Sequence, residues 1–165
     1  MQVIDFTDPI LKIAFTAVCK KGLTLHSWAD LDKPELRVAV DKGSSHDALA
    51  TRVLKQAQII RLESASDATL ALQAGRADVQ ILVLPLALAL ASRNPAIGAV
   101  VIPTPNEVAT SNGGVRKETD QRWLQHVNKW LAAERASGNI RKTFIANLKS
   151  VGGVGEDKMP PQLEV

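Results

Sequence analysis

The sequence predicts an α/β fold in which helices flank a largely parallel sheet. Three observations predict it. Apolar segments with strand character are followed by segments whose apolar residues recur at helical spacing, and this order repeats between residues 36 and 103. The links between these segments are short, and they contain Gly, Ser or Pro residues of the kind that begin or end elements. Strand, helix and strand joined by short links form βαβ motifs, whose strands pair in parallel through right-handed crossovers.

Most elements of this region carry a start or a stop signal. The segment Ala77–Val83 is apolar enough to be a strand that is buried on both faces. Ser64 or Ser66 is a candidate N-cap, and Pro85 suits the first turn of a helix. In chain order we predict a strand that ends near Asp41, a helix from His46, a strand at Gln58–Leu62, a helix that Gly75 ends, a strand at Ala77–Val83, a helix through about Ser92, and a strand at Ala99–Ile102 that Pro103 stops.

The turn Gly43-Ser44-Ser45, between the first strand and the first long helix, has two interpretations. In one, Gly43 supplies the turn, and Ser44 or Ser45 caps the helix by accepting hydrogen bonds from its first backbone N–H groups. In the other, the small residues leave these N–H groups open to an anion. Asp47 lies in the first helical turn, where a negative charge suits the helix dipole. The turn alone favours the cap.

Two amphipathic helices are predicted near the end of the chain. Thr119 or Asp120 would cap the first, which runs to about Ala136 and is terminated by Gly138. After Gly152 and Gly153 we expect a frayed tail. The apolar stripe of the first helix consists of Trp123, Leu124, Val127, Trp130 and Leu131, and that of the second consists of Ile140, Phe144, Ile145 and Leu148.

The composition is that of a soluble globular protein. Of the 165 residues, 45% are hydrophobic and 22% are charged, with a net charge of +3. Aromatic residues make up only 4% and Tyr is absent, which weakens the case for a surface that stacks on bases or sugars. The basic residues between Val115 and Ser150 alternate with apolar ones, which favours a solvated helix face over a nucleic-acid patch. The apolar run Ile81–Ala91 is shorter than the roughly 20 residues of a membrane span.

No catalytic or metal-binding constellation is evident in the sequence. His26, His46 and His126 are far apart and have no partner at zinc-ligand spacing, and we expect His46 to be solvated. No G-x-S-x-G motif surrounds Ser44 or Ser45. A single cysteine, Cys19, excludes an intrachain disulfide. We therefore expect no enzyme activity, no metal and no cofactor.

Four segments, in order along the chain, resemble one protein family. They are VIDFTDPI (3–10), HSWADLDKPELRVAVDKGSS (26–45), ALQAGRADV (71–79) and VRKETDQRWLQHVNKWLAAERASGNIRKTF (115–144). They are similar to segments of the extracellular solute-binding proteins of ABC importers, of the type that binds polar amino acids and related small solutes (family 3, type 2 periplasmic-binding fold). The resemblance covers nearly the whole chain.

The resemblance implies a fold of two α/β lobes that close on a ligand at a hinge. On that pattern, residues 1–35 are a crossover or hinge segment with a short helix, and residues 36–103 are the ligand-binding second lobe. Residues 104–150 are the return crossover and the C-terminal helices of the first lobe, and residues 151–165 are a flexible tail. Most of the first lobe is expected to be missing from this chain.

The resemblance also implies a ligand site at Gly43, Ser44 and Ser45, where backbone N–H groups and hydroxyls meet a carboxylate. With this resemblance, the anion site becomes the favoured interpretation of the turn. The family's ligand-binding arginine precedes the stretch Val3–Phe6 and so falls outside the chain. Two positions depart from the family pattern: Val83 stands where an Asp binds the ligand's amino group, and Ile10 stands where an aromatic residue is often found.

The function that the resemblance implies is that of a solute-binding component of an ABC importer. Its ligand would be a small polar or anionic solute, an amino acid or a related carboxylate, and its partners would be the importer's membrane subunits. The resemblance implies a periplasmic or extracellular location, although the chain shows no signal peptide. Without most of the first lobe, we expect weak solute binding or none.

Two alternative functions remain open. The chain could be an oligomerising or degenerate binding module without a transport ligand, because the stripe Trp123, Val127, Trp130 and Leu131 lacks the lobe that would cover it. This predicts a homo-oligomer. The other alternative is an enzyme similar to cyclohexadienyl or arogenate dehydratase on the same fold. Its only candidate acids are Glu63, Asp67 and His46.

Overall fold

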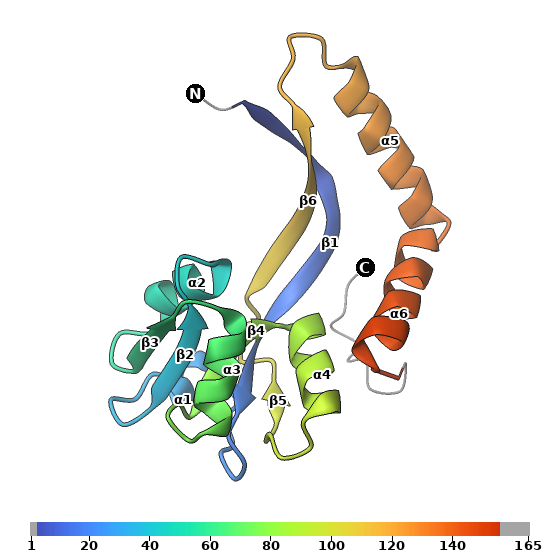
Figure 1. Cartoon of the computed structure of the whole chain (residues 1–165). Coiled ribbons are helices and arrows are strands. Elements are labelled where there is room, and N and C mark those ends of the chain that lie inside the picture. Colours follow the sequence, from blue (N-terminus) through green and yellow to red (C-terminus); the bar gives the residue numbers. More distant parts are fainter. Residues whose placement is uncertain (1–2, 156–165) are drawn as a thin grey trace. The chain divides into compact units, whose positions relative to one another are not determined.

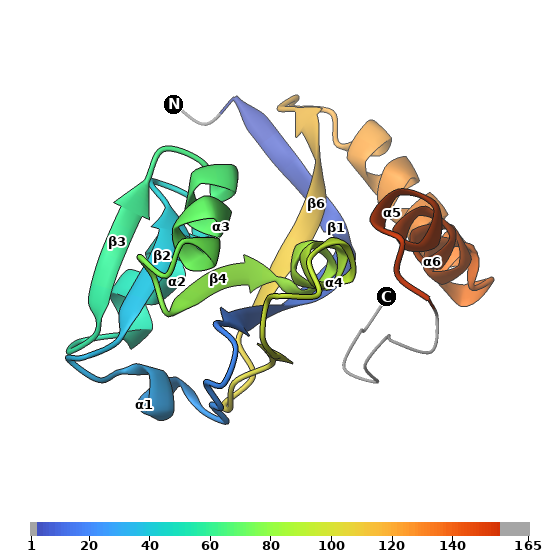
Figure 2. The ribbon, with the colours of Figure 1, turned by 60° about the horizontal axis from the view of Figure 1, so that its bottom comes forward.

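A computed structural model describes residues 3–155, which fold as two compact units (Figure 1). Unit 2 comprises residues Ala14–Ala109, and unit 1 comprises Met1–Ile13 together with Thr110–Val165. Strand β1 (Ile4–Cys19) and strand β6 (Val108–Arg116) pair with each other, and each has residues in both units (Figures 1 and 2).

The sheet of unit 2 confirms the predicted α/β fold class. Its strands are β2 (Arg37–Asp41), β3 (Gln58–Leu62), β4 (Val79–Val83) and β5 (Val100–Val101), in the order β3-β2-β4-β1-β5. β2 pairs in parallel with β3 and β4, whereas β1 pairs antiparallel with β4 and β5. β1 was not predicted, and it lies within residues 1–35, which were expected to be a crossover or hinge segment with a short helix.

Helices cover both faces of this sheet, which gives three layers. The helices are α1 (Trp28–Leu31), α2 (Ser45–Val53), α3 (Ala65–Gln73) and α4 (Leu84–Arg93). Ser44 caps α2 and Ser64 caps α3, so one of the two predicted serines does so in each case. The sheet residues that pack with α1 and α2 are Val38, Val40, Val79 and Ile81, and those that pack with α3 or α4 are Ala39 and Leu82.

Asp78 joins three chain segments at the amino end of β4. Its carboxylate is 3% exposed and accepts hydrogen bonds from Lys20 Nζ at 2.7 Å, from Arg37 N at 2.9 Å and from Arg37 Nε at 2.9 Å. The Arg37 guanidinium, together with Lys20, holds the Asp78 pKa well below its usual range, although burial opposes the charge. The GRAD sequence at residues 75–78 therefore has a structural role, with Gly75 ending α3 at a positive φ of 69°.

The described residues of unit 1 form a two-stranded ribbon and two helices, α5 (Arg122–Ala136) and α6 (Asn139–Gly152). The helix α5 is tied to β1 because Asn128 Oδ1 accepts a hydrogen bond from Asp8 N at 2.9 Å and the Arg135 guanidinium donates to the Pro9 carbonyl. The predicted cap of α5 is wrong, since Gln121 occupies the N-cap position. Asp120 instead accepts a hydrogen bond from Arg122 N.

The C-terminal part of the chain departs from the predicted tail. α6 extends to Gly152, and Val154 is buried, so residues 151–154 belong to the folded unit. The rest of the predicted tail, residues 156–165, lies outside the described residues. Among residues 3–155, no helix is long and apolar enough to cross a membrane.

Candidate functional site

The predicted ligand residues lie at the edge where the parallel strands end. β2, β3 and β4 end at Asp41, Leu62 and Val83, and the helices α2, α3 and α4 begin shortly after them. In open α/β sheets, ligands bind at the carboxyl ends of the strands, where helix N-termini present unpaired N–H groups. The turn Gly43–Ser45, which contains the three predicted residues, connects β2 to α2 at this edge.

Ser44 acts as the helix cap that the first interpretation predicts. Its Oγ accepts hydrogen bonds from His46 N at 3.1 Å and from Asp47 N at 3.2 Å. Gly43 has a positive φ of 73°, and its N–H donates to Asp47 Oδ2 at 3.0 Å. Several donors of the turn are thus already paired within it. Ser45 is exposed, and its hydroxyl forms no hydrogen bond with any other described residue.

The expectation that His46 is solvated is wrong. His46 is 7% exposed, and its Nδ1 lies 2.8 Å from Asp41 Oδ1, while Val83 N donates to its Nε2 at 3.2 Å. Because a backbone N–H can only donate, Nε2 must be the acceptor and Nδ1 must carry the proton given to Asp41. The ring of Phe15 packs edge-on against the imidazole, with centroids 5.9 Å apart. His46 therefore connects the end of β2 to the start of α4.

A sequence signal for the burial of His46 was present. With Leu49, Ala50 and Val53 it completes the spacing i, i+3, i+4 and i+7 that marks the apolar face of a helix. Burial of Asp41 opposes its charge, but its hydrogen bonds with His46 and Ser44 outweigh this effect and lower the Asp41 pKa. Both ring nitrogens of His46 form hydrogen bonds, one with Asp41 and one with Val83. The ring therefore holds these two residues in position.

The N-cap residue of α4, Val83, has an uncharged side chain. It forms no side-chain cap and packs partly buried against the apolar cluster that contains Phe15. Pro85 occupies the first turn of α4, as predicted. Valine has no group that can pair with an ammonium. Val83 therefore contributes only apolar contact, because its backbone N–H already donates a hydrogen bond to His46.

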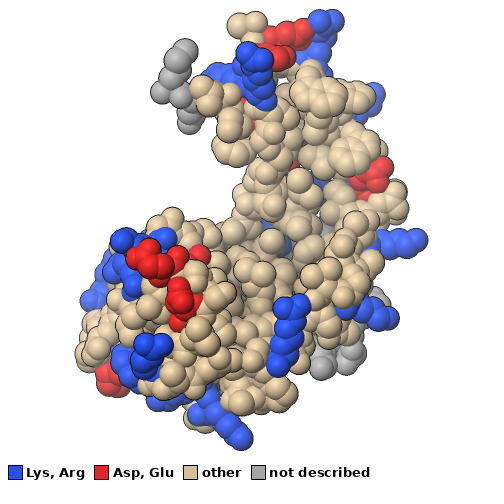
Figure 3. Space-filling model, in the orientation of Figure 1, with Lys and Arg blue, Asp and Glu red and all other residues tan. Residues whose placement is uncertain are grey.

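Charged side chains around this edge are largely paired with one another. Arg61 Nε donates to Asp47 Oδ1 at 2.9 Å, and Lys42 lies 3.9 Å from Glu63. The Gly43 N–H and the Arg61 charge lower the Asp47 pKa against the effect of its burial. In Figure 3, acidic and basic side chains lie next to each other on the part of the surface over α2 and β3. The surface charge around this edge is therefore of both signs.

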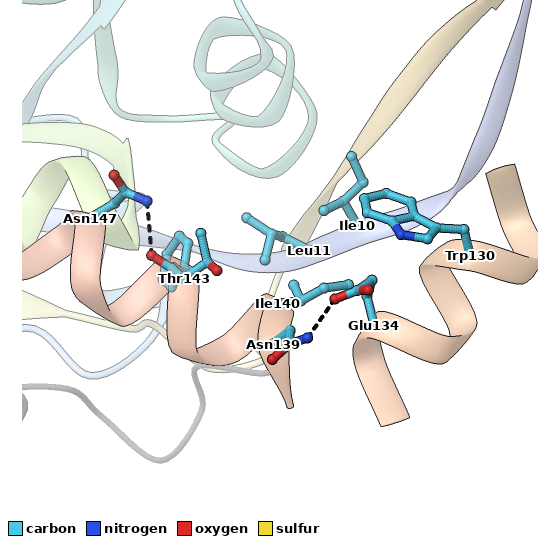
Figure 4. A pocket seen from close by; sticks show the side chains of 9 residues that line it. Ile10, Leu11, Trp130, Glu134, Asn139, Ile140, Thr143 and Asn147 are labelled. Atoms are coloured by element: carbon cyan, nitrogen blue, oxygen red, sulfur yellow. Dashed lines mark hydrogen bonds between the residues drawn. The ribbon is translucent and has the colours of Figure 1, made fainter. Parts of the chain in front are cut away.

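Unit 1 contains an open apolar cavity of about 350 Å³ (Figure 4). Trp130 and Glu134 reach it from α5, Ile140 and Thr143 from α6, and Ile10 from β1. Glu134 Oε2 accepts a hydrogen bond from Asn139 Nδ2 at 2.8 Å. None of the predicted ligand residues lines this cavity.

The remaining reactive side chains of the described residues offer no further site. No group of three or more His, Cys, Asp or Glu side chains within residues 3–155 is arranged to hold a metal ion. The Cys19 thiol is buried, and burial raises its pKa to about 11, which keeps it protonated and unreactive.

The chain is similar in fold to several solved structures, whereas no protein-family model and no curated protein matches its sequence. A substrate-binding protein of an amino acid ABC transporter from Streptococcus pneumoniae, bound to L-arginine, has a TM-score of 0.76 and 21% identity over 93% of this chain and 64% of its own. An ABC transporter binding component from Wolinella succinogenes, complexed with lysine, has a TM-score of 0.75 and 25% identity over 94% of this chain and 65% of its own.

The chain has the fold of the amino-acid-binding proteins of ABC transporters. This confirms the resemblance noted in the sequence. An ancestral cyclohexadienyl dehydratase also has this fold, with a TM-score of 0.55 and 30% identity over 89% of this chain and 61% of its own. This solute-binding fold therefore carries both binding and catalysis. The chain spans less than two thirds of the length of each of these three structures.

Proposed function

We propose that the chain is a solute-binding component of an ABC-type importer that takes a small polar or anionic solute, an amino acid or a related carboxylate. The observation that carries this proposal is the likeness of more than nine tenths of the chain to amino-acid-binding proteins of such transporters. The proposal assigns residues 36–103 to the ligand-binding lobe, and residues 1–35 and 104–150 to the hinge and to an incomplete first lobe.

The proposed ligand site is the turn Gly43, Ser44 and Ser45 at the start of α2. The positive end of the helix dipole favours a carboxylate there. Ser44 Oγ accepts two backbone N–H groups and its hydroxyl forms a hydrogen bond with Asp41, so the exposed Ser45 hydroxyl is the side-chain donor of the turn that is open to a ligand. Val83 gives no counter-charge to an ammonium group, which favours ligands held mainly through their carboxylate.

Amide chemical-shift mapping of the full chain tests this site, because it detects weak binding. Titration with L-arginine, and separately with a simple carboxylate such as succinate, is expected to shift the backbone amides of Gly43, Ser44 and Ser45. Replacement of Ser45 by Ala should reduce these shifts, whereas Ser66→Ala, at a helix start of the same lobe, should not. Shifts that cluster elsewhere, or saturable binding that Ser45→Ala leaves unchanged, would refute the site.

A dehydratase is the second candidate function, because an ancestral cyclohexadienyl dehydratase shares the fold. The side chains present do not favour it. Both nitrogens of His46 are occupied, Glu63 is exposed beside Lys42, and Asp67 accepts a hydrogen bond from the Ser64 hydroxyl at 2.7 Å. We expect no conversion of prephenate or arogenate by the purified chain, and measurable turnover that depends on one of these groups would reverse this assignment.

The proposal includes a location and two kinds of partner. The chain would act in the periplasm or outside the cell together with the membrane subunits of the importer, which cell fractionation and co-purification test. It would also self-associate through Trp123, Val127 and Trp130. Leu131 does not belong to that surface, since it is 3% exposed within unit 1.

A further inference from the structure

The imidazole of His46 joins two strands at a point where their backbones no longer pair. The parallel pairing of β2 with β4 ends with Ala39 and Gln80. Beyond these residues, His46 Nδ1 lies 2.8 Å from Asp41 Oδ1 at the end of β2, and Val83 N at the end of β4 donates to His46 Nε2 at 3.2 Å. The ring therefore takes the place of a backbone connection between β2 and the residue that precedes α4.

Only the neutral ring can form both of these hydrogen bonds. Nδ1 carries the proton that is donated to Asp41, and Nε2 needs a lone pair in order to accept the Val83 N–H. Protonation of the ring places a second proton on Nε2, where it faces the hydrogen of Val83 N. Two donors then oppose each other at a residue that is only 7% exposed. The protonated form of His46 and its hydrogen bond with Val83 therefore exclude each other.

Among the elements that pack on the His46 ring, β2 alone contributes a charged group that faces it. β2 contributes the Asp41 carboxylate, β1 the uncharged ring of Phe15, and β4 the Val83 N–H. The first turn of α4 contains no acidic residue. Burial of Asp41 opposes its charge, but its hydrogen bonds with His46 and Ser44 outweigh burial and lower its pKa. The carboxylate therefore stays charged over the range in which histidines titrate, about pH 5 to 8.

The helix that carries His46 contributes one further charge nearby, and this charge has other partners. Asp47 follows His46 in α2, and its carboxylate accepts hydrogen bonds from Gly43 N at 3.0 Å and from Arg61 Nε at 2.9 Å. The N-terminal ends of α2 and α4 both lie at the ring, and their helix dipoles disfavour a cation there. A protonated ring therefore keeps its hydrogen bond with Asp41 and loses the other one.

We propose that His46 is a pH switch whose protonation releases the start of α4 from β2, while the turn Gly43–Ser45 stays attached to β2 through Asp41. The switch also regulates solute binding at this turn, and this second part rests on the proposed function. His46 Nδ1 lies 3.5 Å from Ser44 Oγ, so a protonated ring adds a positive charge beside the turn and strengthens the binding of a carboxylate. Proton and solute therefore favour each other's binding.

Nuclear magnetic resonance of the full chain labelled with nitrogen-15 tests the switch without any ligand. At about pH 8 we expect a scalar coupling across the hydrogen bond between Val83 N and His46 Nε2, and at about pH 5 we expect its loss as the ring is protonated. His26 and His126 are exposed and serve as internal controls, because their protonation should leave the Val83 amide unchanged. A coupling that persists in the protonated form, or a His46 ring that stays neutral at about pH 5, would overturn the proposal.

Two substitutions separate the switch from other effects of acid. His46→Gln supplies an amide oxygen that can accept the Val83 N–H but takes up no proton, so the chemical shift of the Val83 amide should become independent of pH over the same range. Asp41→Asn removes the carboxylate that favours the protonated ring, and the change at Val83 should move to lower pH. A Val83 amide that responds to pH in His46→Gln as it does in the wild type would show that another group is the sensor.

Titration with L-arginine at the same two pH values tests the link to the solute site. The dissociation constant, taken from the amide shifts of Gly43–Ser45, should be about fivefold smaller at the lower pH in the wild type and equal at both in His46→Gln. The carboxylate of the ligand is charged at both pH values, so its own protonation does not contribute. Absence of saturable binding at either pH, with the change at Val83 intact, would refute the solute site alone. Saturable binding of equal affinity at both pH values would refute the regulation of that site by His46.

Discussion

The two units of the chain differ in how completely they bury their apolar residues. Unit 2 covers both faces of its sheet with helices and leaves three large apolar side chains exposed, Leu70, Leu86 and Val108. The described part of unit 1 has a two-stranded ribbon and two helices, and it exposes twice as many large apolar side chains, Val3, Ile4, Phe6, Trp123, Trp130 and Val151. Two strands alone are marginally stable in water. Unit 2 therefore has its own closed core, whereas the described part of unit 1 leaves more large apolar side chains exposed.

The largest expected effect is the loss of a side chain from the core of unit 2. Ile81 is completely buried on β4 between β2 and β1. Ile81→Ala should lower the free energy of unfolding by about 2–5 kcal/mol, because it removes apolar contact and leaves a cavity. Denaturant unfolding measures this, with Leu70→Ala on the surface as the control. A loss below about 1 kcal/mol would mean that unit 2 lacks a tightly packed core.

A second substitution tests the buried charge that joins segments of unit 2. Asp78→Asn leaves Lys20 and Arg37 without their counter-charge and should cost about 3 kcal/mol. The pKa of Asp78 is depressed in the folded state, so its contribution is present above the pKa of the unfolded chain and is lost as pH falls. The stability difference between wild type and variant should therefore shrink below about pH 4. A difference that is constant between pH 7 and pH 3 would show that the carboxylate charge is not responsible.

Local signals explain why most of unit 2 could be predicted from the sequence. Serine caps, Gly75 and Pro85 specify where helices begin and end through contacts within a few residues, and they lie where the sequence analysis placed them. The parallel pairing of β2 with β3 follows from the short βαβ link. The resemblance to solute-binding proteins also predicted the fold family, which the solved structures confirm.

Long-range pairing explains what the sequence did not show. β1 is a strand because distant segments pair with it, β4 and β5 in unit 2 and β6 along the ribbon, and its Pro9 argues locally against a strand. The burial of His46 likewise depends on Val83, which is 37 residues away. At the candidate site, the cap formed by Ser44 could be predicted, but the pairing of the Gly43 N–H with Asp47 depends on the fold of the turn.

A smaller effect is expected at the edge of unit 2 that carries the proposed ligand site. His46→Ala removes the acceptor of the Val83 N–H and the donor to Asp41, and should lower the free energy of unfolding by about 1–3 kcal/mol. Hydrogen exchange of the Val83 amide should become faster, whereas that of Val38, in the middle of the core, should change only with global stability. Unchanged exchange at Val83 would show that His46 does not connect β2 to α4.

The smallest expected effect on stability lies in unit 1. At concentrations where the chain is monomeric, Trp130→Ala should change the free energy of unfolding by no more than about 0.5 kcal/mol, because more than half of this side chain is already in water. Leu131→Ala, at the adjacent buried position, is the matched control and should cost several times more. If Trp130→Ala were instead as damaging as Leu131→Ala in the monomer, the ring would be part of a core within unit 1. The contrast between a closed unit 2 and an open unit 1 would then fail.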